Sequence, residues 1–129
     1  MKPRICLIAL FLMIAAAPGW AANLVYWTNL NGGNWSVAAN WAINGNGAQG
    51  VPGPADTALI VSNGTYTVTN NASPTISGLT VGASGGGGTQ TLTNTSSLVL
   101  NGAGTVTANG VLGFTGNTLS GTGSSREQR

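Results

Sequence analysis

The most restrictive feature of this sequence is its division into short β-favouring runs that alternate with corners rich in Asn and Gly. Each run is three to seven residues long and consists largely of Thr, Val, Ile, Leu or Tyr, which strands prefer. Asn and Gly tolerate the positive φ angles of tight turns, whereas strong helix formers such as Lys, Glu and Met are nearly absent. The predicted strands are 57–61, 65–69, 75–81, 89–93, 97–100, 105–107, 111–114 and 118–120.

These short runs predict an all-β protein, and a parallel β-helix (solenoid) is the architecture that we expect. Internal sequence similarities favour this architecture: Gly78–Ala83 resembles Ser97–Ala103, and Thr-x-Thr units recur at 67–69, 91–93 and 105–107. In a solenoid the successive coils stack, so that their apolar residues form one continuous core. Because the units are unevenly spaced, an antiparallel β-sandwich stays open as the alternative.

Charge is almost absent from the interior of the chain. Between Ile5 and Ser125 the only charged residue is Asp56, and the sequence contains no His. Acid–base pairs, Ser/His/Asp triads and His- or Cys-based metal sites all need side chains that are missing here. We therefore expect no catalytic residue, no cofactor and no metal ion in these residues. We interpret Asp56 as a structural turn residue after Pro54, with a carboxylate that accepts backbone N–H bonds.

Residues 1–21 are expected to form a secretory signal peptide. Lys2 and Arg4 precede an uninterrupted apolar run over residues 5–17, and Gly19–Ala21 places small residues at the −3 and −1 positions of a cleavage site. The run is too short for a transmembrane anchor, which needs roughly 20 residues. Cleavage would remove the single cysteine and two of the four basic residues, which leaves a neutral chain without disulfides. We expect an exported protein, extracellular or at the bacterial cell surface, without a transmembrane span or a nucleic-acid partner.

Residues 22–56 are expected to form an N-terminal cap, because three tryptophans cluster there. Large aromatic side chains bury much area and would close the exposed end of a solenoid. We also consider Trp27, Trp35 and Trp41 as candidate glycan contacts, since an exposed indole can stack on a sugar ring, although packing is the favoured interpretation. Residues 57–123 would form the coils, and 124–129 a polar tail at which the sequence of a longer protein is cut short.

Several motifs follow one another in a recognisable series: Trp27, Gly33–Ser36, Asn40-Trp41, Pro52–Asp56, Ala58–Ile60 and Ile76–Val81. The series resembles the N-terminal region of large exported bacterial β-helix proteins, including autotransporter-like passengers and adhesin-like surface proteins. The resemblance covers essentially residues 27–123. It implies a right-handed parallel β-helix at the cell surface or outside the cell. No catalytic residue of the family carries over, because no acidic or basic position is present to match.

Three functions remain open on this evidence. The first is an adhesin-like, non-catalytic scaffold whose neutral, hydroxyl- and amide-rich face binds glycans, or surface proteins of a host or a neighbouring cell. The second is the N-terminal cap of a carbohydrate-active β-helix enzyme whose catalytic coils lie outside these residues. The third is an ice-binding Thr-rich solenoid, suggested by the Thr-x-Thr units, although their unequal spacing departs from the constant coil length that this function needs.

Two glycine-rich motifs carry no function in this context. Gly45–Gly50 matches the dinucleotide pattern G-x-G-x-x-G, but no strand is predicted before it, and Pro52 and Pro54 prevent the helix that should follow. Gly82–Gly86 matches the nucleophile elbow G-x-S-x-G, yet the chain has no His to serve as its base.

Overall fold

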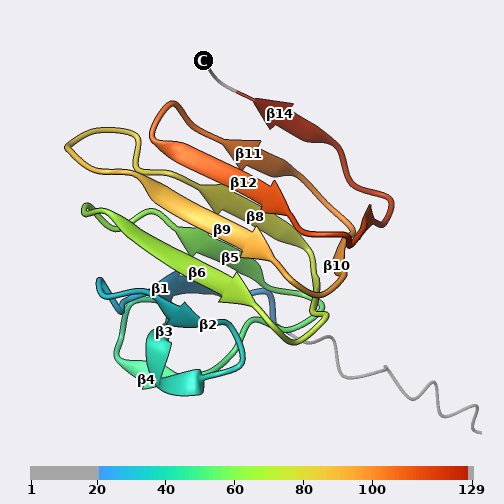
Figure 1. Ribbon diagram of the computed structural model, residues 1–129. Coiled ribbons are helices and arrows are strands. Elements are labelled where there is room, and N and C mark those ends of the chain that lie inside the picture. Colours follow the sequence, from blue (N-terminus) through green and yellow to red (C-terminus); the bar gives the residue numbers. More distant parts are fainter. Residues whose placement is uncertain (1–20, 128–129) are drawn as a thin grey trace, which may run out of the picture.

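The computed structural model describes residues 21–127, and this part of the chain is all-β, as predicted (Figure 1). Its one helical element is the short 3-10 turn η1 (Ala38–Asn40). The expected signal peptide lies almost entirely in residues 1–20, outside the described residues. The strands are β1 (Leu24–Trp27), β2 (Gly33–Asn34), β3 (Trp41–Ile43), β4 (Ala48–Gln49), β5 (Thr57–Ile60), β6 (Tyr66–Asn70), β7 (Thr75–Ile76), β8 (Gly78–Val81), β9 (Gln90–Asn94), β10 (Leu98–Leu100), β11 (Gly104–Val106), β12 (Gly110–Phe114), β13 (Leu119–Ser120) and β14 (Ser125–Glu127).

The strands form three sheets. Sheet A has the order β14-β11-β8-β5-β1-β3-β4, sheet B the order β12-β9-β6-β2, and sheet C the order β13-β10-β7. All pairs in sheets B and C are parallel, and sheet A is mixed because β3 pairs antiparallel with both β1 and β4. Antiparallel pairing is thus confined to the N-terminal strands, which does not fit the alternative of an antiparallel sandwich.

From β5 onward the chain passes through the sheets in the repeated order A, B, C. We call one such passage a circuit. Each strand pairs in parallel with the strand of the same sheet one circuit earlier: β8 with β5, β9 with β6, and β10 with β7. The length of a circuit varies, since Gln90 pairs with Gly110, 20 residues later, whereas Leu79 pairs with Gly104, 25 residues later.

All eight predicted strands occur within one or two residues of their expected bounds. The predicted strand 75–81 is divided, because the chain turns a corner at Ser77 between β7 in sheet C and β8 in sheet A. Residues 124–129 were expected to be a polar tail, but Ser125–Glu127 form β14, which pairs with β11. Backbone pairing of this kind does not depend on an apolar sequence, so the polar composition concealed the strand.

The core is built by side chains that alternate inward and outward along each strand. In sheet B the inward residues of β6 and β9 are buried, and those of one strand lie directly over those of the other. One column runs from Val68 to Leu92 and on to Leu112, and a second joins Asn70 to Asn94. The core therefore continues from one circuit to the next.

Two of these inward residues are asparagines whose side chains hydrogen-bond to each other. Asn70 and Asn94 are both fully buried, and Asn70 Nδ2 donates a hydrogen bond of 2.9 Å to Asn94 Oδ1. Asn94 Nδ2 in turn donates to the carbonyl of Gly113 on the next circuit, at 3.2 Å. The amides thus form a short ladder that ties three successive strands of sheet B together at their carboxyl ends.

We predict that Asn94→Ala lowers the free energy of unfolding by about 2–3 kcal/mol, because the substitution leaves a buried amide of Asn70 and the Gly113 carbonyl without this partner. Urea denaturation monitored by circular dichroism measures the change. Asn31→Ala is the matched control, since Asn31 is exposed, and it should stay within about 0.5 kcal/mol of the wild type. Equal stability of the two variants would contradict a role for the ladder.

Candidate functional site

The three tryptophans of the N-terminal segment lie inside the core. Trp27 and Trp35 are fully buried, and Trp41 is 1% exposed. Trp41 packs edge-to-face against both others, with ring centroids 5.0 Å from Trp27 and 4.7 Å from Trp35. Its Nε1 donates to the carbonyl of Trp35 at 2.8 Å. The glycan-contact interpretation is corrected accordingly, because a fully enclosed indole offers no face to a sugar ring, and these rings serve packing.

Asp56 lies at the turn before β5 and joins two distant parts of the chain. Its Oδ1 accepts hydrogen bonds of 3.0 Å from both the backbone N–H and the side-chain amide of Asn23. Its Oδ2 accepts a bond of 2.8 Å from the backbone N–H of Gly53. This is the bonding expected of a turn carboxylate, and it anchors the residue that precedes β1 beside the start of β5.

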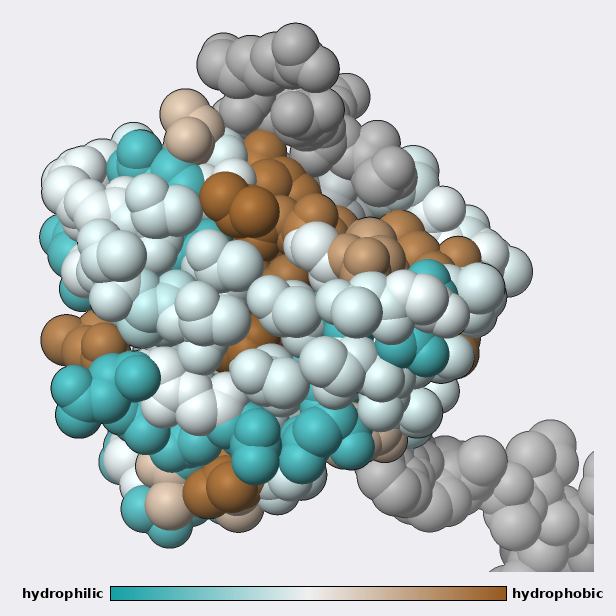
Figure 2. Space-filling model, viewed as in Figure 1, coloured by the Kyte–Doolittle hydropathy of each residue, from teal (hydrophilic) through white to brown (hydrophobic). Residues whose placement is uncertain are grey.

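The outward side of sheet B carries a regular set of threonines. Thr67 lies opposite Thr91, and Thr69 lies opposite Thr93, in the parallel register of β6 and β9. We call these four residues the threonine face. Strand geometry spaces them about 4.8 Å apart between strands and about 6.7 Å apart along a strand. In Figure 2 the front of the molecule, where Figure 1 shows β6 and β9, is largely pale, as expected for threonine and glycine.

The hydroxyl groups of the threonine face form no hydrogen bond with another described residue, whereas neighbouring threonines are engaged. Thr65 Oγ1 accepts a bond of 3.2 Å from the N–H of Thr89, and Thr95 Oγ1 donates to the carbonyl of Asn70 at 2.9 Å. The four central hydroxyls therefore stay available to an external partner, and each of them can both donate and accept.

The threonine face has clear limits. On β12 its two columns continue with Val111 and Gly113, and on the other side Asn34 of β2 lies opposite Thr69. The further Thr-x-Thr unit at 105–107 begins in β11, which belongs to sheet A, so it does not extend the face. The similarity between Gly78–Ala83 and Ser97–Ala103 likewise relates strands of different sheets. Unequal connections between strands cause these shifts, and the sequence repeats alone did not reveal them.

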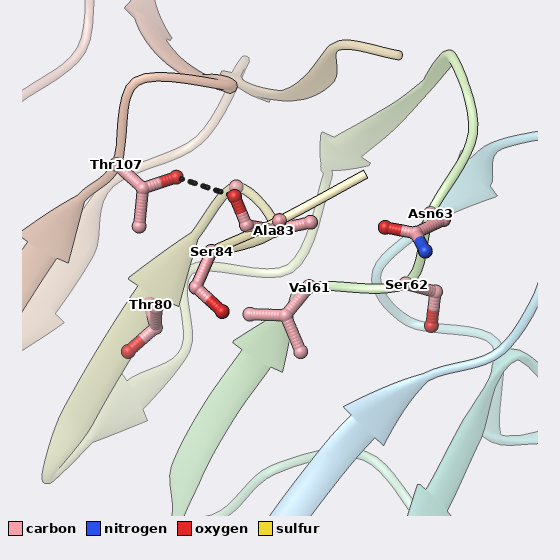
Figure 3. A pocket seen from close by; sticks show the side chains of 9 residues that line it. Val61, Ser62, Asn63, Thr80, Ala83, Ser84 and Thr107 are labelled. Atoms are coloured by element: carbon pink, nitrogen blue, oxygen red, sulfur yellow. Dashed lines mark hydrogen bonds between the residues drawn. The ribbon is translucent and has the colours of Figure 1, made fainter. Parts of the chain in front are cut away.

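A groove lies where the chain leaves sheet A for sheet B (Figure 3). Its volume is about 470 Å³. The hydroxyl group of Thr107, which lines the groove, already donates a hydrogen bond of 3.3 Å to the carbonyl of Ala83. The lining residues are Val61, Ser62, Asn63, Thr80, Gly82, Ala83, Ser84, Gly85 and Thr107. All of them are neutral, so the groove offers hydrogen-bonding and apolar contacts but no acidic or basic side chain.

Gln90 fixes the loops around this groove. Its buried side chain donates from Nε2 to the carbonyl of Gly64 at 2.6 Å and accepts at Oε1 from the N–H of Ala83 at 2.7 Å. The loop after β5 and the loop after β8 are thereby joined through one amide. Both of these loops contribute residues that line or border the groove.

Tyr66 places a second buried polar group near the groove. The residue is 5% exposed, and its hydroxyl has no hydrogen-bond partner of ordinary geometry among the described residues. Burial raises the pKa of this hydroxyl above its usual value, and the neighbouring Ser62 offsets the rise only in part.

Within residues 21–127, no three His, Cys, Asp or Glu side chains come together in a way that could hold a metal ion. In the same part of the chain, no helix has both the length and the apolar character needed to cross a membrane. The chain matches no family model, no curated protein and no solved structure. The threonine face, defined by the register of β6 and β9, is the candidate site that the geometry itself supports.

Removal of the Asp56 carboxylate should loosen the junction between β1 and β5. We predict that Asp56→Ala lowers the free energy of unfolding by about 1–3 kcal/mol, because the N–H groups of Asn23 and Gly53 lose a charged acceptor. Asp56→Asn retains one acceptor oxygen and should recover part of the loss. Denaturant titration of both variants checks the prediction, which an Ala variant as stable as the wild type would refute.

The raised pKa of Tyr66 predicts a loss of stability in alkali. The folded protein holds the proton of the Tyr66 hydroxyl more tightly than the unfolded chain does. The stabilisation that this proton gives is complete below the unfolded pKa of about 10. Stability should then fall as the pH rises through the higher pKa of the folded protein. Tyr66→Phe should lessen this decline, whereas Tyr26→Phe should leave it in place. Thermal unfolding measured from neutral pH upward tests both variants, and identical alkaline profiles would count against the prediction.

Proposed function

We propose that this chain is the beginning of a right-handed parallel β-helix. The repeated passage through sheets A, B and C supports this architecture, as does the parallel pairing of each strand with the strand one circuit earlier. The continuous inward columns, such as Val68 over Leu92, give further support, because stacked coils share one core in a solenoid. The N-terminal strands with their three buried tryptophans act as its cap.

The function that we propose is that of an exported, adhesin-like scaffold that binds neutral glycans without catalysis. The observation that carries this proposal is the threonine face, four free hydroxyls held in register on one side of sheet B. Glycans are themselves arrays of hydroxyl groups, so a neutral surface that both donates and accepts can bind them without any charge. Each contact is weak, and binding strength would come from several contacts made together.

Export and surface location are part of the same proposal. The basic and apolar start of the chain favours secretion, and the resemblance to exported bacterial β-helix proteins points the same way. The absence of cysteine from residues 7–129 is compatible with stability that depends on backbone ladders and packing alone.

Ice binding is the second candidate, and the parallel register of β6 and β9 favours it as well. Thr67 and Thr69 lie opposite Thr91 and Thr93, which makes a regular two-by-two set of free hydroxyls. Against this candidate, the set is only two strands wide, and Val111 and Gly113 occupy the next strand. A surface this small offers few sites to an ordered lattice.

We predict that replacing all four threonines of the face by valine lowers retention on neutral, insoluble polysaccharides about tenfold or more, because valine keeps the shape of threonine and removes its hydroxyl. Sedimentation of the protein with chitin, cellulose and xylan measures retention. The matched control is Thr80→Val with Thr105→Val, an adjacent pair of half-buried threonines on sheet A, which should bind like the wild type.

The same variants separate the two candidate functions. An ice-recrystallisation assay that responds to the fourfold variant, together with unchanged polysaccharide retention, would favour ice binding. Wild-type behaviour of the fourfold variant in both assays would reject the threonine face as a binding site.

A further inference from the structure

Six asparagines of this chain are followed directly by glycine. An asparagine in this position can modify itself, because glycine has no Cβ to keep its backbone nitrogen away from the asparagine side chain. The nitrogen attacks Cγ, and the side-chain amide leaves as ammonia. The reaction needs a free nitrogen and a backbone that can move, so the fold decides which pair reacts. The pairs are Asn31-Gly32, Asn44-Gly45, Asn46-Gly47, Asn63-Gly64, Asn101-Gly102 and Asn109-Gly110.

Backbone hydrogen bonds protect three of these pairs. In each of the three, the glycine N–H donates to a carbonyl group of another residue. The nitrogen must lose its proton before it can attack, and the carbonyl holds this proton until the local structure opens. The three bonds run from Gly32 to Asn29 (3.0 Å), from Gly64 to Gly87 (3.3 Å) and from Gly110 to Thr107 (2.9 Å).

Close packing of the backbone protects the pair Asn101-Gly102. A Cβ at Gly102 would collide with the carbonyl of Ser77, and a Cβ at Gly123 would collide with the carbonyl of Gly102. Neighbouring circuits therefore hold residue 102 on both sides. They resist the backbone rotation that would bring Cγ of Asn101 to the nitrogen of Gly102.

Asn44 lies in the turn between β3 and β4, but its side chain is bound to residues at the start of β1. Its Oδ1 accepts a hydrogen bond of 3.0 Å from the N–H of Leu24, and its Nδ2 donates one of 3.0 Å to Asn23 Oδ1. The first bond keeps the side-chain carbonyl at β1 and not over Gly45. The second bond retains the amide group that would have to leave.

Asn46 lies in the same turn and has none of these restraints. The turn is at the lower end of Figure 1, and Asn46 is exposed there. A Cβ on Gly47 would meet nothing within 4 Å. Neither the Gly47 nitrogen nor Asn46 Nδ2 forms a hydrogen bond with another described residue. The attacking nitrogen and the leaving amide are therefore both free.

The one hydrogen bond of the Asn46 side chain favours the reaction. Its Oδ1 accepts a bond of 3.0 Å from the N–H of Ala48, which closes a turn across the intervening Gly47. The side-chain carbonyl is thereby held beside the nitrogen that would attack it. The Ala48 N–H also points at the oxygen on which negative charge develops during the attack, as the donors of an oxyanion hole do.

We propose that Asn46 is a site of spontaneous deamidation, at which the turn promotes its own modification. The Gly47 nitrogen loses its proton to water or hydroxide and bonds to Asn46 Cγ. The Cγ–Nδ2 bond breaks, and the amide takes up a proton and leaves as ammonia. Water then opens the succinimide at either of its carbonyl groups, which gives aspartate or isoaspartate. Water is the only co-reactant.

The modification changes the charge and the geometry of the turn. A carboxylate replaces a neutral amide in a chain whose only charged residue between Ile5 and Ser125 is Asp56. Isoaspartate also carries the backbone through the former side chain, which lengthens the turn between the paired residues Ile43 and Ala48. We therefore expect the isoaspartate form to pair β4 less firmly with β3.

The test compares the six pairs in the folded and the unfolded protein. The protein is expressed from the full sequence, purified in its final processed form and incubated at mildly alkaline pH, with and without guanidinium chloride. Peptide mapping by mass spectrometry follows each pair. Without structure the six rates should be similar. In the folded protein Asn46 should convert fastest, and the other five pairs should slow at least about tenfold, because each must first open locally.

Matched variants identify the site by its charge. Each deamidation adds one negative charge, which isoelectric focusing resolves. Asn46→Gln should abolish the first acidic species to appear, because glutamine would have to form a larger ring that closes more slowly. Asn101→Gln is the matched control, since Asn101 is also exposed and also precedes glycine, and it should retain this species. Circular dichroism verifies that both variants are folded.

Conversion of another pair as fast as Asn46 in the folded protein would overturn the proposal. Folding that slows Asn46 as much as the other five pairs would overturn it too, as would an early acidic species that persists in Asn46→Gln. These outcomes do not depend on the proposed function, because the turn belongs to sheet A and the threonine face to sheet B.

Discussion

Parallel backbone pairing between strands one circuit apart is the constraint on which the rest of this structure depends. It places equivalent positions directly above one another, so that every inward residue meets an inward residue of the next strand. Val68 over Leu92 and Asn70 over Asn94 are two results of this stacking. A charge at such an inward position would be buried without a partner, and Asp56 is the only charged residue between Ile5 and Ser125. Asp56 lies in a turn and is held by backbone N–H groups.

The two ends of the stacked strands differ in structure. At the N-terminal end the chain reverses through β3 and β4, and three indole rings fill the space beneath them. At the other end, the last described strands of sheets B and C leave Phe114 and Leu119 partly exposed. The two ends therefore differ in how much of their apolar surface is covered.

The threonine face depends on the register of the strands and not only on how many threonines the chain contains. Threonine is frequent throughout the chain, but the register of β6 and β9 is what brings Thr67, Thr69, Thr91 and Thr93 together in a two-by-two set whose hydroxyls no described residue binds. The unit at 105–107 has the same pattern and lies on another sheet. Connections of different length separate the two cases, and a connection's path depends on close backbone contacts. Gly82, for example, has a φ of +104° and leaves no room for a side chain beside Gly110.

The sequence by itself determined the β class, the positions of the strands between residues 57 and 120, and the neutrality of the surface. These properties follow from local preferences and from residue types, which need no knowledge of distant contacts. It did not show which strands stack, that Leu24–Trp27 and Ser125–Glu127 pair with remote strands, or that the tryptophans are enclosed. Only the tertiary structure decided these points, because pairing between strands 20 or more residues apart depends on the length and path of every corner between them.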